Sequence, residues 1–164
     1  MSSIILLDRD THAERMLESY LGTRVKLGHK HSGAPFIQGD DRYVSLSHKN
    51  DYLVVALSDD PIGVDIELLE GKDAYFRIAR RYFGESVEEG DVEGFFRAWT
   101  KREALGKYLG LGLNKEVMQR DLSGQSAQVG EDTVYFVHYI VDGYMITVCG
   151  KEPDAQLIKG GQHE

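Results

Sequence analysis

The sequence has one cysteine and no long apolar run, and each absence excludes a class of protein. Cys149 stands alone, which excludes a disulfide framework and a cysteine-rich zinc site. No apolar stretch approaches the roughly 20 residues that span a bilayer, and the run Ile4–Leu7 is too short for the core of a signal peptide. We therefore expect a soluble, cytoplasmic protein that is not bound to a membrane.

Positive charge is also scarce in this chain. The 19 Lys and Arg residues stand against 27 Asp and Glu residues, so the formal net charge is −8. Non-specific binding to nucleic acid draws most of its affinity from Lys and Arg. The acidity therefore argues against a nucleic-acid partner.

Hydrophobic patterning predicts a single α+β domain. The chain has 164 residues, of which 41% are apolar, and this is enough for one domain with its own core. Strands are expected at 3–7, 43–48, 52–57, 62–67, 133–140 and 144–149, and helices at 12–21, 74–83 and 92–109. Residues 23–42 lack periodicity and are expected to be a loop. The domain is expected to cover residues 1–150, with residues 151–164 as a polar, flexible tail.

The segment Ile62–Glu67 alternates apolar and acidic residues. On a strand, its three apolar side chains point to the core, whereas Asp65 and Glu67 project from the other face. The two carboxylates are then about 7 Å apart and could share one hard cation such as Mg²⁺. A half-exposed strand with a solvated acidic face shows the same alternation, so the pattern alone leaves both interpretations open.

The long helix predicted at Val92–Leu109 carries a second candidate group. Trp99, Glu103 and Lys107 are spaced i, i+4 and i+8, so they lie along one helix face. Glu103 could complete a metal site or act as a general base, and Lys107 could hold a phosphate oxygen. The same spacing also suits a core tryptophan and a Glu–Lys pair that stabilises the helix by a few tenths of a kcal/mol.

Two further groups of cationic or titratable side chains have both a functional and an ordinary interpretation. His48 ends the run Val44–His48, where a histidine can donate a hydrogen bond to a phosphate or simply sit at the edge of a loop. Arg77, Arg80 and Arg81 share one predicted helix. They form either a solvated face or a surface for an acidic partner.

Three segments together resemble the 4′-phosphopantetheinyl transferases. They are Leu46-Ser47-His48, Gly63-Val64-Asp65-Ile66-Glu67 and the helix motif from Trp99 to Lys107, and they occur in the family's order. Glu67 and the Trp99 form of the helix motif resemble the surfactin-activator-like subclass, although the chain is short for it. The resemblance covers about residues 44–113.

The resemblance implies a Mg²⁺-dependent enzyme of the holo-[acyl-carrier-protein] synthase type. Such an enzyme transfers phosphopantetheine from coenzyme A to a serine of an acyl or peptidyl carrier protein, releases adenosine 3′,5′-bisphosphate, and serves fatty acid, polyketide or nonribosomal peptide biosynthesis. Carried over by position, Asp65, Glu67 and Glu103 would hold Mg²⁺. Glu103 would also take the proton from the attacking serine. Lys107 and His48 would contact phosphate oxygens of coenzyme A.

Two positions depart from the family pattern. Arg102 replaces the lysine that precedes the helix glutamate. The positive charge for coenzyme binding is kept, but the compact ammonium group of lysine is replaced by the planar guanidinium of arginine. Gly33-Ala34-Pro35 stands where relatives have Gly-Lys-Pro, so one expected phosphate-contacting lysine is missing. Lys30 or His31 could take its place.

The resemblance further implies a fold of two pseudo-symmetric α+β halves. The first half would be abbreviated and run to about residue 60, the second would cover residues 61–150, and the protein would be a monomer. Two alternatives remain at this point. One is a catalytically impaired relative that binds a carrier protein or coenzyme A, and the other is a metal-dependent nuclease, against which the acidity counts.

Overall fold

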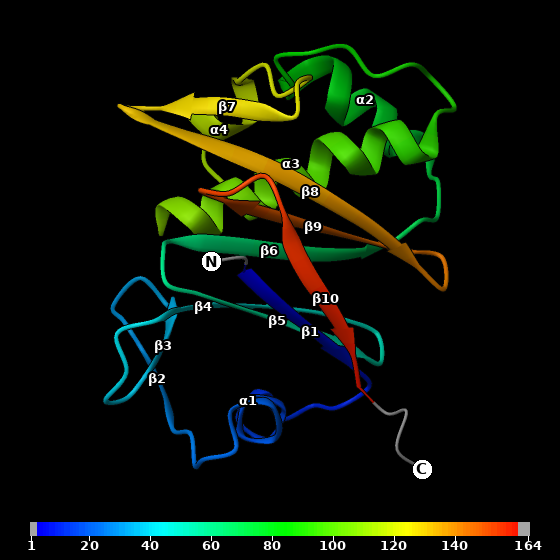
Figure 1. Ribbon diagram of the computed structural model, residues 1–164. Coiled ribbons are helices and arrows are strands. Elements are labelled where there is room, and N and C mark those ends of the chain that lie inside the picture. Colours follow the sequence, from blue (N-terminus) through cyan, green and yellow to red (C-terminus); the bar gives the residue numbers. More distant parts are fainter. Residues whose placement is uncertain (1–2, 161–164) are drawn as a thin grey trace.

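The protein is a mixed α+β structure built in stacked layers (Figure 1). The computed structural model describes residues 3–160. Within that range the elements are β1 (Ser3–Asp8), α1 (Ala13–Leu21), β2 (Leu27–His29), β3 (Pro35–Ile37), β4 (Tyr43–Lys49), β5 (Tyr52–Ser58), β6 (Ile62–Leu68), α2 (Asp73–Tyr82), α3 (Val92–Leu109), α4 (Lys115–Gln119), β7 (Ser126–Val129), β8 (Asp132–Val141), β9 (Tyr144–Gly150) and β10 (Ala155–Lys159). The predicted α+β class is confirmed, and each predicted strand and helix is present with small shifts at its ends. No helix in the described range is long and apolar enough to cross a membrane.

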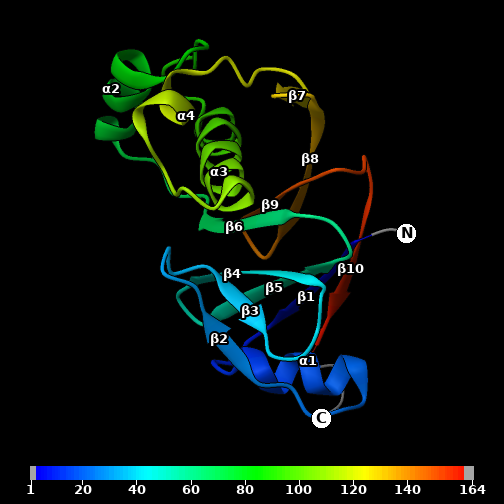
Figure 2. The same cartoon turned by 90° about the vertical axis from the view of Figure 1, so that its left-hand side faces the viewer.

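Two four-stranded sheets form the centre of the molecule. The first sheet has the strand order β10-β1-β5-β4, and the second has the order β6-β9-β8-β7. The sheets stack face to face, with α1 below the first and α2, α3 and α4 above the second (Figures 1 and 2). The short hairpin of β2 and β3 lies beside β4 at one end of this stack.

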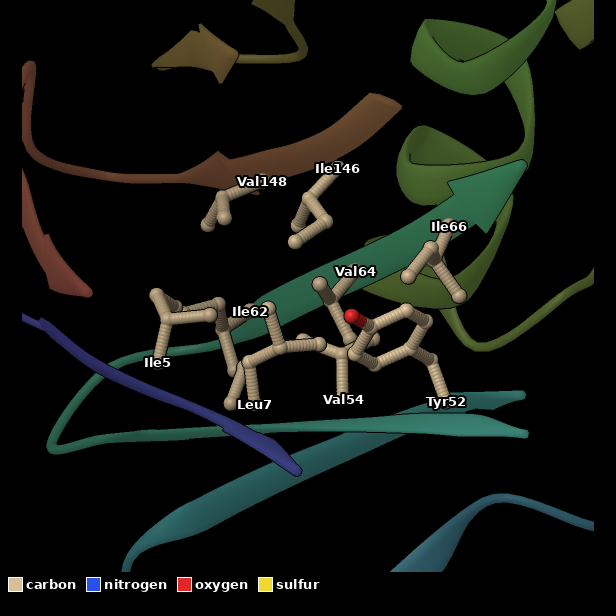
Figure 3. Close-up of a cluster of buried hydrophobic side chains, with 10 residues drawn as sticks. Ile5, Leu7, Tyr52, Val54, Ile62, Val64, Ile66, Ile146 and Val148 are labelled. Carbon is tan, nitrogen blue, oxygen red and sulfur yellow. The ribbon is translucent and has the colours of Figure 1, made fainter. Parts of the chain in front are cut away.

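The space between the two sheets is filled by apolar side chains (Figure 3). The first sheet contributes Ile5, Leu7, Tyr52, Val54 and Ala56, and the second contributes Ile62, Val64, Ile66, Ile146 and Val148. Burying each large side chain contributes about 1.5–3 kcal/mol, so this layer holds the sheets together. The predicted inward direction of the three apolar residues in β6 is confirmed. Their acidic neighbours therefore lie on the opposite face, under α3.

Two expectations about irregular segments were wrong. Residues 23–42 contain the β2–β3 hairpin, whose strands have only three residues each and therefore give no periodic signal. Residues 155–159 of the expected flexible tail form β10, which pairs in parallel with β1. Because β10 is an edge strand that partly buries Leu157 on one face and Ile158 on the other, its sequence does not alternate. The first sheet thus takes strands from both ends of the chain, while residues 161–164 lie outside the described residues.

Gly63 allows α3 to lie directly on β6. A Cβ atom at Gly63 would come within 1.9 Å of the Ala104 carbonyl oxygen and 2.7 Å of the Tyr108 nitrogen. Both atoms belong to the helix backbone and cannot rotate away. Any side chain at this position would therefore push α3 off the sheet.

We expect Gly63→Ala to lower the free energy of unfolding by about 1–3 kcal/mol or more, because the helix must move to admit the methyl group. Urea denaturation followed by circular dichroism measures the loss. Gly150→Ala is the matched control, since a Cβ there meets only the Ile62 side chain at an ordinary 3.8 Å. Equal stabilities for the two variants would show that the close approach of α3 is unimportant.

Candidate active site

The two sheets meet along a seam where β4 of the first sheet lies beside β6 of the second. The two strands belong to different sheets, and serine side chains link them. The Ser45 hydroxyl accepts a hydrogen bond from the Val64 amide at 3.2 Å, and the Ser47 hydroxyl accepts one from the Ile66 amide at 3.2 Å. Ser47 also donates to Asp65 Oδ1 at 3.0 Å. β6 is an edge strand of its sheet, and these hydroxyls accept hydrogen bonds from two of its buried amides, so they link the two sheets at the seam.

Lys107 closes the seam from above. Its Nζ donates to the Leu46 carbonyl of β4 at 2.8 Å and to the Val64 carbonyl of β6 at 3.0 Å. An ammonium group has three donors, so one N–H remains for another acceptor. Burial lowers the pKa of Lys107, while the carboxylates of Asp65 and Glu103 oppose that shift. Lys107 is therefore both a link between the sheets and a cation beside two acids.

Asp65 is buried at the seam, with 4% of its surface exposed. Its Oδ2 atom is also buried and has no hydrogen-bond partner within residues 3–160. Burial raises the pKa of Asp65 to about 8, with Lys107 acting against the shift and the charges of Glu67 and Glu103 adding to it. The interpretation of a solvated acidic face is therefore wrong for Asp65. Because Asp65 Oδ2 is an acceptor with no donor in contact, its position favours the binding of a cation beside it.

Two further carboxylates lie near Asp65, that of Glu103 on α3 and that of Glu67 on β6 itself. Glu103 lies one helical turn before Lys107 on α3 and is half-buried, and burial raises the pKa of its carboxyl. Glu67, near the end of β6, forms an ion pair with Lys49, whose Nζ lies 3.5 Å from Glu67 Oε1. The structure therefore brings Asp65, Glu103 and Lys107 together, while Glu67 is nearby and paired with a lysine.

The donor set fits a hard divalent cation. Among residues 3–160, no three His, Cys, Asp or Glu side chains converge as a complete metal-binding group. Mg²⁺ does not need such a group, since it usually binds one or two carboxylates and completes its shell with water and substrate phosphates. Asp65 and Glu103 supply two carboxylates, and a cation would give the buried Asp65 Oδ2 the partner that it lacks within residues 3–160.

His48 lies at the same edge but does not join this group. Its side chain is exposed near the end of β4 and, by strand alternation, points away from the face of Ser47. Its imidazole makes no hydrogen bond or ion pair within the described part of the chain. The predicted contact between His48 and a phosphate therefore stays a prediction.

Two adjoining hollows open beside Lys107, which lines both. One of about 340 Å³ is lined by His29, Ser32, Gly33, Ala34, Pro35, Val44, Ser45, Leu46, Gly106, Gly110 and Gly112. The other, of about 610 Å³, includes two further cations, Lys30 and Arg42. These volumes lie in the range of small-molecule sites. The β2–β3 hairpin thus forms one wall of both hollows, which meet the site at Lys107, while Asp65 and Glu103 line neither of them.

A family model described as the 4′-phosphopantetheinyl transferase superfamily matches residues 61–149, more than half of the chain. The chain belongs to this superfamily. The matched segment contains Asp65, Glu67, Glu103 and Lys107, whereas His48 and the β2–β3 hairpin lie outside it. The family assignment therefore covers the second sheet and α3, but not the wall formed by the hairpin.

Individual transferases are similar over different lengths of the chain. The transferase gsp of Aneurinibacillus migulanus is 32% identical over 89 residues, which are 49% of this chain and 36% of that protein. A 4′-phosphopantetheinyl transferase of Bacillus subtilis is 27% identical over 79% of this chain and 65% of its own length. The transferase Sfp of Bacillus subtilis strain 168 is 28% identical over 70% of this chain and 57% of its own. The chain thus spans about one third to two thirds of these transferases.

Arg102 does not lie with the other candidate residues of the transferase motif. It is fully buried, and its guanidinium stacks 4.0 Å from the ring centre of Phe83. All five of its N–H donors have acceptors within the protein, namely Met118 O, Ala98 O, Arg120 O and both carboxylate oxygens of Glu85. The geometry does not support the predicted coenzyme-binding role, because Arg102 has no donor left for a phosphate.

Several residues at the site were not predicted from the sequence. Ser45 was detectable, because a polar residue two positions before Ser47 shares its face of the strand. Lys49 gave no signal, since its partner Glu67 follows 18 positions later. Arg42 lies in the stretch that was expected to be a loop. Lys30 lies in the same stretch but was considered as a replacement for the missing phosphate-contacting lysine, and it does line the larger hollow.

Proposed function

We propose that this protein transfers the 4′-phosphopantetheine group of coenzyme A to a serine of an acyl or peptidyl carrier protein and releases adenosine 3′,5′-bisphosphate. The observation that carries the proposal is Asp65 Oδ2, which is buried and has no hydrogen-bond partner within residues 3–160, near the charges of Glu103 and Lys107, with Lys107 lining both hollows. The superfamily assignment supports the reaction class. In this proposal both sheets act as one cytoplasmic, monomeric unit, with the active site at their seam.

Asp65 and Glu103 would hold Mg²⁺ in this proposal. The ion would neutralise charge on the pyrophosphate of coenzyme A and on the departing bisphosphate. The raised pKa values of both carboxyls have a physical consequence here. Buried acids that repel one another are stabilised in their charged form when a cation binds between them, so their arrangement favours metal binding.

Glu103 would also act as the general base. Burial raises the pKa of its carboxyl toward the operating range of a group that accepts a proton near neutral pH. The carrier serine oxygen would attack the β-phosphorus of coenzyme A, and Glu103 would take the serine proton, directly or through water. The bond between that phosphorus and the bisphosphate oxygen would break, and the remaining N–H of Lys107 would face the charge that develops.

The direct test is carrier loading followed by intact-protein mass spectrometry. The protein is incubated with coenzyme A, Mg²⁺ and apo carrier proteins of the fatty-acid and peptide-synthetase types. We expect at least one carrier to gain the mass of phosphopantetheine, with no gain when Mg²⁺ is chelated or when the carrier serine is replaced by alanine. If folded protein leaves both carrier types unmodified, the proposal is wrong.

A catalytically impaired relative is the second candidate. The ion pair between Lys49 and Glu67 favours it, because one of the three predicted metal carboxylates is already neutralised. Such a protein would bind a carrier in calorimetry and would fail to load it. The nuclease alternative gains no support, since the relatives described above are all named as transferases.

A further inference from the structure

A buried chain of polar side chains crosses the interface between α3 and the second sheet. Thr147 on β9 lies in register between Asp65 on β6 and His138 on β8. The Thr147 and Thr100 hydroxyl oxygens are 2.6 Å apart, and the His138 Nδ1 lies 2.7 Å from the Thr147 hydroxyl. Both threonines are completely buried. This chain lies beside the proposed active site and has no part in the mechanism above.

The Phe96 carbonyl, the acceptor at one end of this hydrogen-bonded series, determines the direction of every hydrogen bond in it. The Thr100 hydroxyl must donate to the Phe96 carbonyl, 2.6 Å away, because a carbonyl oxygen only accepts. Thr100 therefore accepts from the Thr147 hydroxyl, and Thr147 accepts from the His138 Nδ1–H. These directions place a proton on Nδ1 of His138. Its Nε2 is buried and has no partner within residues 3–160.

The surroundings of His138 favour the neutral form of its imidazole. Burial lowers its pKa to about 3, and the nearby cations Arg97 and Lys101 add to the effect. The histidine therefore stays uncharged at physiological pH. Its hydrogen bond to Thr147 does not depend on a change of charge near neutrality.

Apart from the hydrogen bond that Lys107, in the last turn of α3, donates to the Val64 carbonyl, the rest of the contact between α3 and the second sheet is largely non-directional. Apolar side chains such as Ala104, Leu105 and Phe136 pack there, and dispersion contacts alone tolerate small sliding or rotation of a helix. The Thr100–Thr147 hydrogen bond is directional and lies one helical turn before Glu103. On the strand side, Thr147 is the register partner of Asp65. The bond thus joins the helix that carries one carboxylate to the strand next to the other.

We infer that Thr100, Thr147 and His138 are positioning residues that set the separation of the Glu103 and Asp65 carboxylates. The inference rests on the proposed function of these two acids. Threonine is a poor residue for the middle of a helix, because its branched Cβ loses rotamer freedom there. Its use at position 100 is explained by the hydroxyl, which reaches both the Phe96 carbonyl and Thr147.

The first test uses Thr147→Val, which removes the hydroxyl and keeps the shape. We expect Mg²⁺ affinity, measured by calorimetry with coenzyme A present, to fall about tenfold to a hundredfold, the usual effect of losing a group that orients a metal ligand. In the loading assay kcat should fall while KM for coenzyme A stays unchanged. Thr133→Val, an exposed threonine on β8, is the matched control and should behave as wild type.

Two further measurements separate positioning from simple loss of stability. Thr100→Ser keeps the hydroxyl and should retain wild-type Mg²⁺ affinity, whereas Thr100→Val should lose it. In ¹⁵N spectra of the wild type, His138 should show a protonated Nδ1 and an unprotonated Nε2 down to pH 5. Folded Thr147→Val and Thr100→Val variants with wild-type Mg²⁺ affinity, or a His138 protonated on Nε2, would overturn the inference.

The test also distinguishes this inference from the proposed function. A protein that binds Mg²⁺ and coenzyme A but loads no carrier contradicts the proposed function. The effect of Thr147→Val on Mg²⁺ affinity can still be measured in that protein. A protein that loads carriers with unchanged rate and Mg²⁺ affinity after Thr147→Val contradicts only the inference.

Discussion

Asp65→Asn is expected to slow carrier loading by about a thousandfold, the size of effect that follows removal of a preorganised electrostatic group from an active site. The amide keeps the shape and can still accept a hydrogen bond from Ser47, but it is a much weaker ligand for Mg²⁺. Glu103→Gln should have an effect of the same order, because it removes both a metal ligand and the general base. Initial rates from mass spectrometry at saturating coenzyme A measure the loss.

The same Asp65→Asn variant should be more stable than the metal-free wild type at neutral pH. The pKa of Asp65 in the folded protein, about 8, lies above the ordinary value of 3.8. The folded state therefore binds more protons than the unfolded state between these values, and the stability of the wild type falls as pH rises from about 4 to about 8. Denaturation without Mg²⁺ across this range should show a shallower decline for the variant.

Glu131→Gln is the matched control for both carboxylates, because Glu131 is exposed in the turn between β7 and β8. It should leave the loading rate and the pH dependence of stability unchanged. If Asp65→Asn and Glu103→Gln both loaded carriers at the wild-type rate, the two acids would not belong to the active site. An Asp65→Asn variant that loses stability would contradict the unfavourable burial of the charge.

Arg102→Met should lower the free energy of unfolding by about 3–5 kcal/mol, the range measured when one partner of a buried ion pair is removed. Glu85 would remain with 10% of its side chain exposed and without its cation. Two backbone carbonyls, that of Met118 near the end of α4 and that of Arg120 just after it, would also lose this donor. Urea denaturation measures the change.

Three further variants sharpen this prediction. Arg97→Met removes a partly exposed arginine of the same helix, which pairs with Glu93 at 3.6 Å, and should change stability by less than about 1 kcal/mol. Adding Glu85→Gln to Arg102→Met should recover part of the loss, because it removes the unpaired charge. Arg102→Lys should also be destabilising, since three donors cannot replace five. A loss below about 1 kcal/mol for Arg102→Met would show that the cluster is not important for stability.

Lys101, the residue before Arg102 on α3, also donates hydrogen bonds to backbone carbonyls. Its Nζ donates to the carbonyls of Leu122 and Gly124, at 2.8 and 2.9 Å. Together with the bonds from Arg102, the carbonyls of alternate residues 118, 120, 122 and 124 are all held by two adjacent cations on α3. The sequence motif drew attention to Arg102 as charge for coenzyme binding, whereas the structure shows that Lys101 and Arg102 both anchor the chain from the end of α4 to β7.

The elements could be predicted where their pattern is local. In β6, alternation correctly placed Ile62, Val64 and Ile66 in the core, because side chains of a strand alternate whatever lies beside it. The end of α1 at Gly22 was also predictable, since glycine readily takes the left-handed conformation that it adopts there, with φ of 73°. The hairpin of β2 and β3 and the edge strand β10 could not be predicted, because short strands at an edge depend on their partners.

By itself, the sequence determined the α+β class, the order of the long elements and the chemical identity of the candidate site, from Asp65 on a strand to Glu103 and Lys107 on a helix. Only the tertiary structure decided which of these side chains meet. The seam is built from residues far apart in the chain, such as Lys107 and the Leu46 carbonyl 61 positions away. Such contacts also decide whether Asp65 is solvated and whether Arg102 has N–H donors left for a ligand. Burial and the pairing of hydrogen-bond donors are properties of the packed structure.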